Sequence, residues 1–124
     1  MKVCSPMENK MNKSFKRTVL IDLDGVLNTY TGGFDENYIP PIKEGAKEFI
    51  EKLYQSFELK LFTTRNKILA SQWLVENELD NYFKDITNIK DLAWLYIDDR
   101  CLKFEGDYSL LTEQIKDFKP WYKK

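Results

Sequence analysis

The chain of 124 residues contains no histidine. This absence excludes Ser-His-Asp and Cys-His catalysis, and it excludes metal sites built on imidazole. Any acid–base catalysis must therefore use Asp, Glu, Lys, Tyr or Cys side chains. Cysteine is scarce as well, since Cys4 and Cys101 lie far apart and match no zinc-binding or redox spacing. We expect both to be free thiols in a reducing compartment.

Long apolar runs and an excess of one charge are also absent. No apolar run reaches the length of a membrane span, and the N-terminus lacks the apolar segment of a secretory signal. With 19 basic and 20 acidic residues, the net charge of −1 gives no electrostatic reason to bind nucleic acid or a membrane surface. These features favour a cytoplasmic protein without membrane association, for which nucleic acid is a partner only as a substrate.

What the chain does contain is an alternation of strand and helix patterns. Residues 1–16 are polar, rich in lysine and without periodicity, so we expect a tail followed by a single domain over residues 17–124. Strand patterns cover residues 18–23, 59–63, 85–87 and 93–97, with a further short strand expected near 103–104. Helix patterns cover residues 42–56, beginning next to Pro41, and residues 66–77 and 110–118. This alternation predicts an α/β domain with a mostly parallel sheet.

Polar residues stand at the ends of three of these predicted strands. The strand ends carry, in chain order, Asp22 and Asp24, then Thr63, Thr64 and Arg65, then Asp98, Asp99 and Arg100. Parallel sheets bind their ligands at the carboxyl ends of the strands. We therefore expect these side chains to meet at one edge of the sheet.

The acidic residues among them point to a metal and a phosphate. Two unit charges about 4 Å apart repel by roughly 4 kcal/mol at an effective dielectric constant near 20, so a fold gathers carboxylates only where a cation or an electrophile uses them. A site of carboxylates alone suits Mg²⁺ and the oxygens of a phosphorylated substrate. With the metal bound, one carboxylate can attack phosphorus, and the second can act first as an acid and then as a base.

At these residues the sequence resembles the haloacid dehalogenase (HAD) superfamily of phosphatases. Residues 22–26, D-L-D-G-V, match the first motif of that superfamily, D-x-D-G-[TV]; residues 61–63, L-F-T, match its second motif, and residues 96–100, Y-I-D-D-R, match its fourth. The resemblance implies a three-layer Rossmann-like fold and hydrolysis of phosphomonoesters through an aspartyl phosphate. It also implies that Asp22 is the nucleophile and Asp24 the general acid and base.

The same resemblance implies the residues that hold the metal and the phosphate. Mg²⁺ would bind the Asp22 carboxylate, the Asp24 backbone carbonyl and the acidic pair Asp98 and Asp99. Thr63 would contact the phosphate, with Thr64 as the alternative if the register is shifted by one residue. Lys90 would supply the phosphate-binding lysine, and Lys84 is the weaker candidate. Arg65 and Arg100 are candidates either for substrate contact or for salt bridges.

The spacing of the motifs leaves no room for a cap domain. One loop and one helix fill the gap between Asp24 and Thr63, and one helix with a short strand fills the gap between Thr63 and Lys90. In this respect the chain resembles the capless members of the superfamily, which act on large or exposed phosphates, including phosphoproteins and polynucleotide ends. A small substrate covered by the aromatic loop of residues 28–41 or by a second subunit stays open.

Three other functions are open at this point. A signalling receiver domain also uses aspartates, Mg²⁺, a threonine and a lysine, but its phosphorylated aspartate lies in mid-chain, whereas here the D-x-D comes first. The second is a phosphate-binding or regulatory domain without catalytic activity, although no motif position is missing. The third is transfer of the phosphoryl group to an acceptor other than water.

Overall fold

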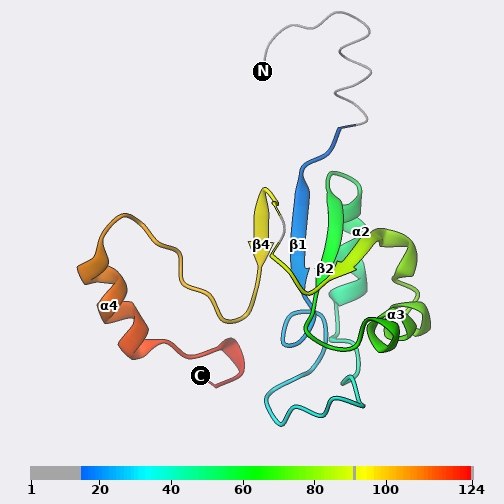
Figure 1. The fold of residues 1–124 in the computed structure, drawn as a ribbon, viewed down its shortest axis with the longest axis horizontal. Coiled ribbons are helices and arrows are strands. Elements are labelled where there is room, and N and C mark those ends of the chain that lie inside the picture. The colour runs from blue at the N-terminus through cyan, green and yellow to red at the C-terminus, as the bar shows by residue number, and fades with distance from the viewer. Residues whose placement is uncertain (1–14, 91, 124) are drawn as a thin grey trace, which may run out of the picture.

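The computed structural model describes residues 15–90 and 92–123, and its centre is a sheet of four parallel strands (Figure 1). The strands are β1 (Thr18–Asp22), β2 (Glu58–Phe62), β3 (Phe83–Thr87) and β4 (Leu95–Ile97). Their order in the sheet is β3-β2-β1-β4, and every neighbouring pair is parallel. The chain thus builds outward from β1 to β3 and then returns to the other side of β1 for β4.

The helices between the strands pack against the sheet, and further helices follow the last strand. Helix α2 (Ala46–Tyr54) joins β1 to β2, and α3 (Lys67–Glu76) with the short helix η1 (Asp80–Tyr82) joins β2 to β3. Helix α4 (Tyr108–Asp117) and the short helix η2 (Trp121–Lys123) follow β4. The architecture is a three-layer, Rossmann-like α/β fold, and residues 15–90 and 92–123 contain no cap, which confirms the fold class predicted from the sequence.

The core lies between β1, β2 and the first two helices. The central residues of β1 are 0–2% exposed, as the unbroken Val-Leu-Ile run predicts for a strand covered on both sides. Leu59 and Leu61 of β2 pack with Ile50 of α2 and Trp73 of α3. The Trp73 indole also donates a hydrogen bond to the Pro40 carbonyl at 3.1 Å, so the loop after β1 is fastened to α3.

Three local predictions are wrong. The first helix begins at Ala46 rather than at Ile42, because Ile42 forms an antiparallel bridge with Asn28 and Gly45 has a left-handed φ of 88°. This bridge closes the loop of residues 28–42 into a flap. Residues 103–104 form no strand, and β4 begins at Leu95 rather than at residue 93.

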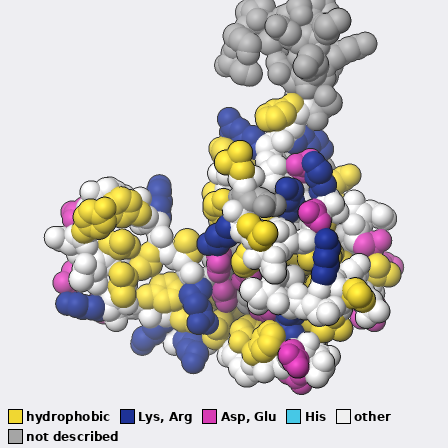
Figure 2. All heavy atoms as spheres, viewed as in Figure 1, with side chains coloured by type: hydrophobic (Ala, Val, Ile, Leu, Met, Phe, Trp, Pro, Cys, Tyr) yellow, Lys and Arg dark blue, Asp and Glu magenta, His cyan; other side chains and the backbone are white. Residues whose placement is uncertain are grey.

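The predicted last helix is confirmed, but it stands apart from the sheet. Asp107 caps α4 by accepting hydrogen bonds from the backbone N–H groups of Ser109 and Leu110, and α4 has no buried residue. Figure 1 shows α4 reached by an extended segment, and Figure 2 shows its hydrophobic side chains lying open to solvent. We call residues 101–120 the C-terminal arm.

Other sequence predictions concern the tail and the cysteines. Of the tail predicted for residues 1–16, only Phe15 and Lys16 belong to the described residues, and Cys4 lies outside them. Cys101 is a free, exposed thiol, as expected. Among the described residues no helix is both long and apolar enough to span a membrane.

Candidate functional site

The acidic residues meet between β1 and β4, where the order of strands in the sheet changes direction. Asp22 is the last residue of β1, Asp98 directly follows β4, and these two strands are neighbours in the sheet. In an open parallel sheet the connections from two such strands leave in different directions and open a crevice at the carboxyl ends. The topology therefore brings residues 22 and 98 together although 75 residues separate them in the sequence.

Three carboxylates form the centre of the site. Asp22, Asp98 and Asp99 each place one oxygen within 4.8 Å of the others. This all-oxygen, anionic donor set fits Mg²⁺, which takes carboxylate and water ligands. The cluster opens into a hollow of about 360 Å³. Its walls are made by Asp22, Asp24, Tyr30, Phe34, Thr64, Asp98, Asp99 and Arg100.

All three side chains of this cluster are acidic, so none can neutralise the charge of another. Burial raises the pKa of Asp22 from 3.8 to about 8, with further contributions from the charges of Asp98, Asp99 and Asp24. Burial also raises the pKa of Asp99, and its hydrogen bond with Asp98 and the charge of Asp98 add to that effect. A buried group that is held away from its preferred charge state is a common sign of a functional site. A divalent cation would relieve the repulsion.

Gly25 makes the turn that lets the first motif approach the acidic pair. Its φ of 84° lies in the left-handed region, and a Cβ at this position would collide with the Asp99 carboxylate. The Gly25 N–H donates to Oδ1 of Asn28 at 3.1 Å. The backbone conformation therefore favours glycine here, and a Cβ would also force the Asp99 carboxylate to move.

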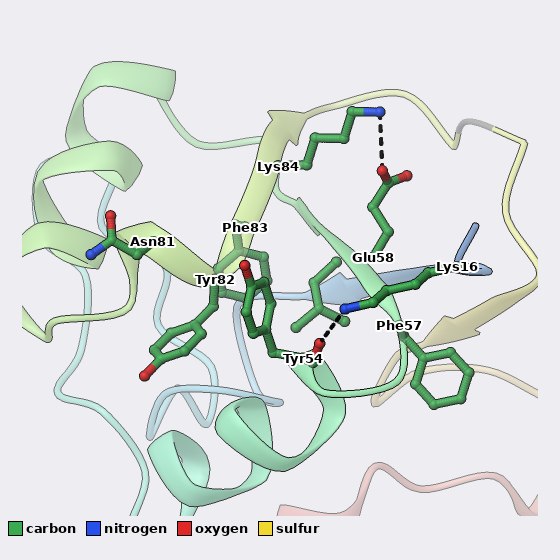
Figure 3. A pocket seen from close by; sticks show the side chains of 9 residues that line it. Lys16, Tyr54, Phe57, Glu58, Asn81, Tyr82, Phe83 and Lys84 are labelled. Atoms are coloured by element: carbon green, nitrogen blue, oxygen red, sulfur yellow. Dashed lines mark hydrogen bonds and ion pairs between the residues drawn. The ribbon is translucent and has the colours of Figure 1, made fainter. Parts of the chain in front are cut away.

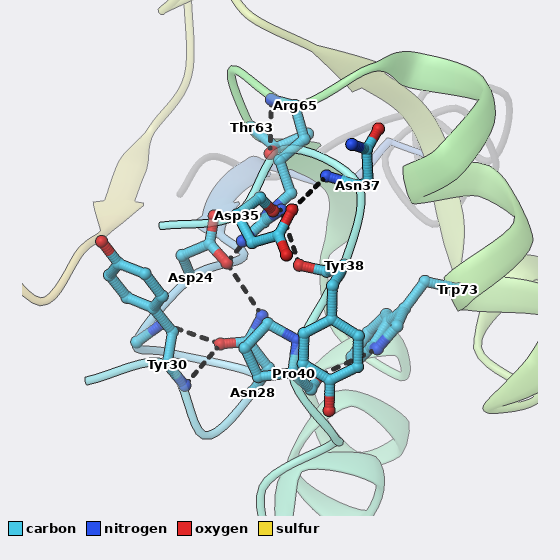
Figure 4. A network of polar contacts seen from close by, with 11 residues as sticks. Asp24, Asn28, Tyr30, Asp35, Asn37, Tyr38, Pro40, Thr63, Arg65 and Trp73 are labelled. Carbon is cyan, nitrogen blue, oxygen red and sulfur yellow. Dashed lines mark hydrogen bonds and ion pairs between the residues drawn. The ribbon is translucent and has the colours of Figure 1, made fainter. Parts of the chain in front are cut away.

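Asp24 is held by a buried polar network (Figure 4). Asn28, which is fully buried, donates from Nδ2 to Oδ1 of Asp24 at 3.0 Å. Arg65 donates from Nε to both carboxylate oxygens of Asp24, at 3.1 and 3.0 Å. The Asp24 carboxyl is thus oriented by two partners and does not belong to the cluster of three carboxylates, while it still lines the same hollow.

Arg65 also fastens the flap to the site. Its NH1 donates to the carbonyls of Asp35 and Tyr38 at 2.8 and 3.0 Å, and its guanidinium lies 4.5 Å from the ring centre of Phe34. The remaining nitrogen, NH2, is buried and makes no hydrogen bond within the described part of the chain. The Arg65 side chain is 6% exposed, and its hydrogen bonds connect Asp24 to the flap.

Of the predicted phosphate-binding residues Thr63, Thr64 and Lys90, only Thr64 lines the hollow. Thr64 is exposed and lines the hollow, whereas Thr63 is 3% exposed and its hydroxyl accepts a hydrogen bond from the Arg65 N–H. Lys90 lies over the ring of Tyr96, 5.5 Å from its centre, and does not line the hollow. Lys84 pairs with Glu58, whose strand begins at the opposite end of the sheet.

Two residues of the site were not identified from the sequence. Asn28 follows Asp24 by four residues, a spacing that brings the two side chains together across the turn, so this contact had a local signal. Trp121 donates from its indole nitrogen to the Gly25 carbonyl at 2.7 Å, across 96 residues. No sequence pattern connects these two positions.

A second hollow of about 340 Å³ opens at the amino end of β2 and β3 (Figure 3). Each of its charged side chains has a partner within the chain. Lys84 lies 3.1 Å from Glu58, and Lys16 donates to the Tyr54 carbonyl at 3.2 Å. Because these contacts already use the charged groups, we do not assign a function to this hollow.

Comparison with solved structures found two similar chains, and the first of them supports the fold. The conserved protein coded by a locus from Bacteroides thetaiotaomicron is similar with a TM-score of 0.56 and 23% identity, over 87% of this chain and 96% of that one. An uncharacterized protein from Listeria monocytogenes serotype 4b gives a TM-score of 0.49 and 17% identity, over 81% of this chain and 59% of that one. No family model and no curated protein matches the chain. At these identities the likeness concerns the fold alone.

Proposed function

We propose that the protein is a Mg²⁺-dependent phosphomonoester hydrolase of the HAD type that works through an aspartyl phosphate. The observation that carries the proposal is the cluster of Asp22, Asp98 and Asp99, with oxygens within 4.8 Å of one another at the carboxyl ends of β1 and β4. Asp24 lines the same hollow, as the second carboxyl that hydrolysis requires.

Asp22, Asp98 and Asp99 would hold the metal, together with the Asp24 carbonyl that the resemblance implies. Bound Mg²⁺ neutralises charge on the carboxylates and on the phosphate oxygens. An Asp22 oxygen attacks phosphorus while the bond from phosphorus to the ester oxygen breaks. A protonated Asp24 donates its proton to that leaving oxygen.

The second half of the cycle reverses the role of Asp24. The Asp24 carboxylate takes a proton from a water molecule, whose oxygen attacks phosphorus as the bond to Asp22 breaks. Inorganic phosphate leaves, and Asp22 and Asp24 return to their starting states. Thr64 lies in the wall of the hollow, where its hydroxyl can donate to a phosphate oxygen.

The openness of the site favours phosphates on large or exposed substrates, such as phosphoproteins or polynucleotide ends. No cap separates the hollow from solvent in the described residues, and of the flap only Tyr30 and Phe34 line it. The net charge of −1 does not favour phosphoproteins over polynucleotide ends.

One observation favours a second candidate, a phosphate-binding or receiver-like domain without turnover. Asp24 accepts hydrogen bonds from both Arg65 and Asn28, so its carboxyl already has partners within the fold that would compete with a leaving group for it. A domain with this arrangement would keep the phosphoryl group on Asp22.

Release of phosphate from an aryl phosphate, with Mg²⁺ and with a chelator, tests both candidates. The hydrolase predicts many turnovers per protein molecule with Mg²⁺ and none with the chelator. The second candidate predicts at most one phosphoryl group per chain, retained on Asp22 and detectable by mass spectrometry. Hydrolysis that does not depend on a metal would contradict the site as a whole.

A further inference from the structure

The C-terminal end of the chain returns to the first motif. Trp121 lies in η2, after the C-terminal arm, and its indole N–H donates to the Gly25 carbonyl at 2.7 Å. Lys43 covers the same ring, with Nζ 4.8 Å from its centre. Next to it, the Tyr122 hydroxyl accepts a hydrogen bond of 2.7 Å from Arg100, which directly follows the acidic pair. Three contacts therefore fix this end beside the carboxylates.

The Trp121 contact completes the fixation of Gly25. The peptide plane before Gly25 includes its N–H and is held by Asn28; the plane after it includes its carbonyl and is held by Trp121. Glycine has more backbone freedom than any other residue, so a turn built on it is well defined only when its neighbours hold both planes. The plane that precedes Gly25 carries the Asp24 carbonyl.

We infer that Trp121 is a positioning residue of the active site, which acts through Gly25 to hold the D-x-D-G turn against Asp99. This inference rests on the proposed function for its catalytic consequence. Without the indole N–H, the second plane can rotate, and the distances that Mg²⁺ needs between the turn and the acidic pair become less well defined. The C-terminal end is thus a component of the site.

Trp121→Phe tests the inference, because it keeps an aromatic ring under Lys43 and removes only the N–H donor. Trp94→Phe is the matched control, since Trp94 is similarly exposed (52% against 43%) but stacks on Phe57, away from the carboxylates. We expect Trp121→Phe to lower kcat and to raise the Mg²⁺ concentration for half-maximal activity, each by roughly 3- to 10-fold, the effect of one hydrogen bond. Trp94→Phe should change neither quantity.

A second measurement does not require activity. In a ¹H–¹⁵N spectrum the Trp121 indole signal is identified by its loss in Trp121→Phe, and we expect added Mg²⁺ to shift it while the Trp94 signal stays in place. An unshifted Trp121 signal, or a Trp121→Phe variant with wild-type kcat and Mg²⁺ dependence, would overturn the inference. If the wild-type protein hydrolyses no phosphomonoester, the proposed function fails, and the Mg²⁺-induced shift alone decides the role of Trp121.

Discussion

The hollows at the two ends of the sheet have nearly the same volume, about 360 and 340 Å³, but they treat charge in opposite ways. At the amino end Lys84 and Glu58 lie 3.1 Å apart and satisfy each other. At the carboxyl end Asp22, Asp98 and Asp99 repel one another. The two hollows therefore differ in charge and not in volume, and the unneutralised charge at the carboxyl end is the charge that the proposed Mg²⁺ would neutralise.

The largest expected effect comes from removing the nucleophile. Asp22→Asn should lower kcat by roughly 10³-fold or more, since no aspartyl phosphate can form. Glu58→Gln, in the hollow at the amino end, is the matched control and should keep wild-type activity. Phosphate release by the two variants and the wild type, at equal protein concentration, gives the comparison. A similar loss of kcat in both variants would contradict the assignment of the active site to the carboxyl end of the sheet.

Replacing the acid gives the next largest effect. Asp24→Asn should slow turnover by roughly 10²- to 10⁴-fold. Its amide cannot donate a proton to a leaving alkoxide, whereas a nitrophenolate needs little help. The loss should therefore be greater with an alkyl phosphate than with a nitrophenyl phosphate. Equal losses on the two substrates would contradict the assignment of Asp24 as the general acid.

Arg65→Lys should have an intermediate effect. Lysine keeps the positive charge but cannot reach Asp24 and the carbonyls of Asp35 and Tyr38 at once, as the planar guanidinium does. We expect a loss of about 10-fold in kcat/KM. Thermal unfolding of the variant separates this positioning effect from a general loss of stability. Wild-type kcat/KM would mean that the connection to the flap does not matter for catalysis.

The smallest expected effect is a dependence of stability on pH that has opposite signs at the two ends. The pKa of Asp22 is raised to about 8 in the folded protein, so its contribution is fully present below pH 4 and is lost as the pH rises to about 8. Without Mg²⁺ this amounts to about 1–3 kcal/mol after solvent screening is allowed for. Asp22→Asn should remove this share of the loss and leave the smaller share that comes from the raised pKa of Asp99.

Glu58 should behave in the reverse manner. Its hydrogen bonds from Thr18 and Lys84 lower its pKa, so its stabilisation is present above its ordinary value of 4.5 and is lost as the pH falls. Chemical denaturation of wild type, Asp22→Asn and Glu58→Gln at several pH values measures both effects. A wild-type protein whose stability does not fall between pH 4 and 8 in a chelator would contradict the raised pKa of Asp22.

The sequence was sufficient for the parts of the fold that depend on local pattern. The apolar run of β1, the periodicity of the helices and the order of strand ends led to the α/β class and to the placement of Asp22 next to Asp98. Boundaries were less predictable, because the start of α2 depends on a tertiary contact. Ile42 continues the helical pattern in sequence but pairs with Asn28 in the structure.

The site was predictable where motif residues meet and unpredictable where distant side chains arrange them. The positions of the acidic residues follow from strand topology alone. The partner of Arg65 does not, since its sequence position after Thr64 fits a phosphate contact equally well, and only the folded flap shows that the guanidinium is occupied. The contact between Trp121 and Gly25 spans 96 residues and depends on the path of the arm.

That path has a consequence for how the protein can be modified. Helix α4 contributes nothing to the described core, while both ends of its segment are attached beside the carboxylates, through Arg100 and Trp121. We therefore expect that a loop or a peptide can replace α4 without rebuilding the sheet, as long as the Trp121 indole still reaches the Gly25 carbonyl.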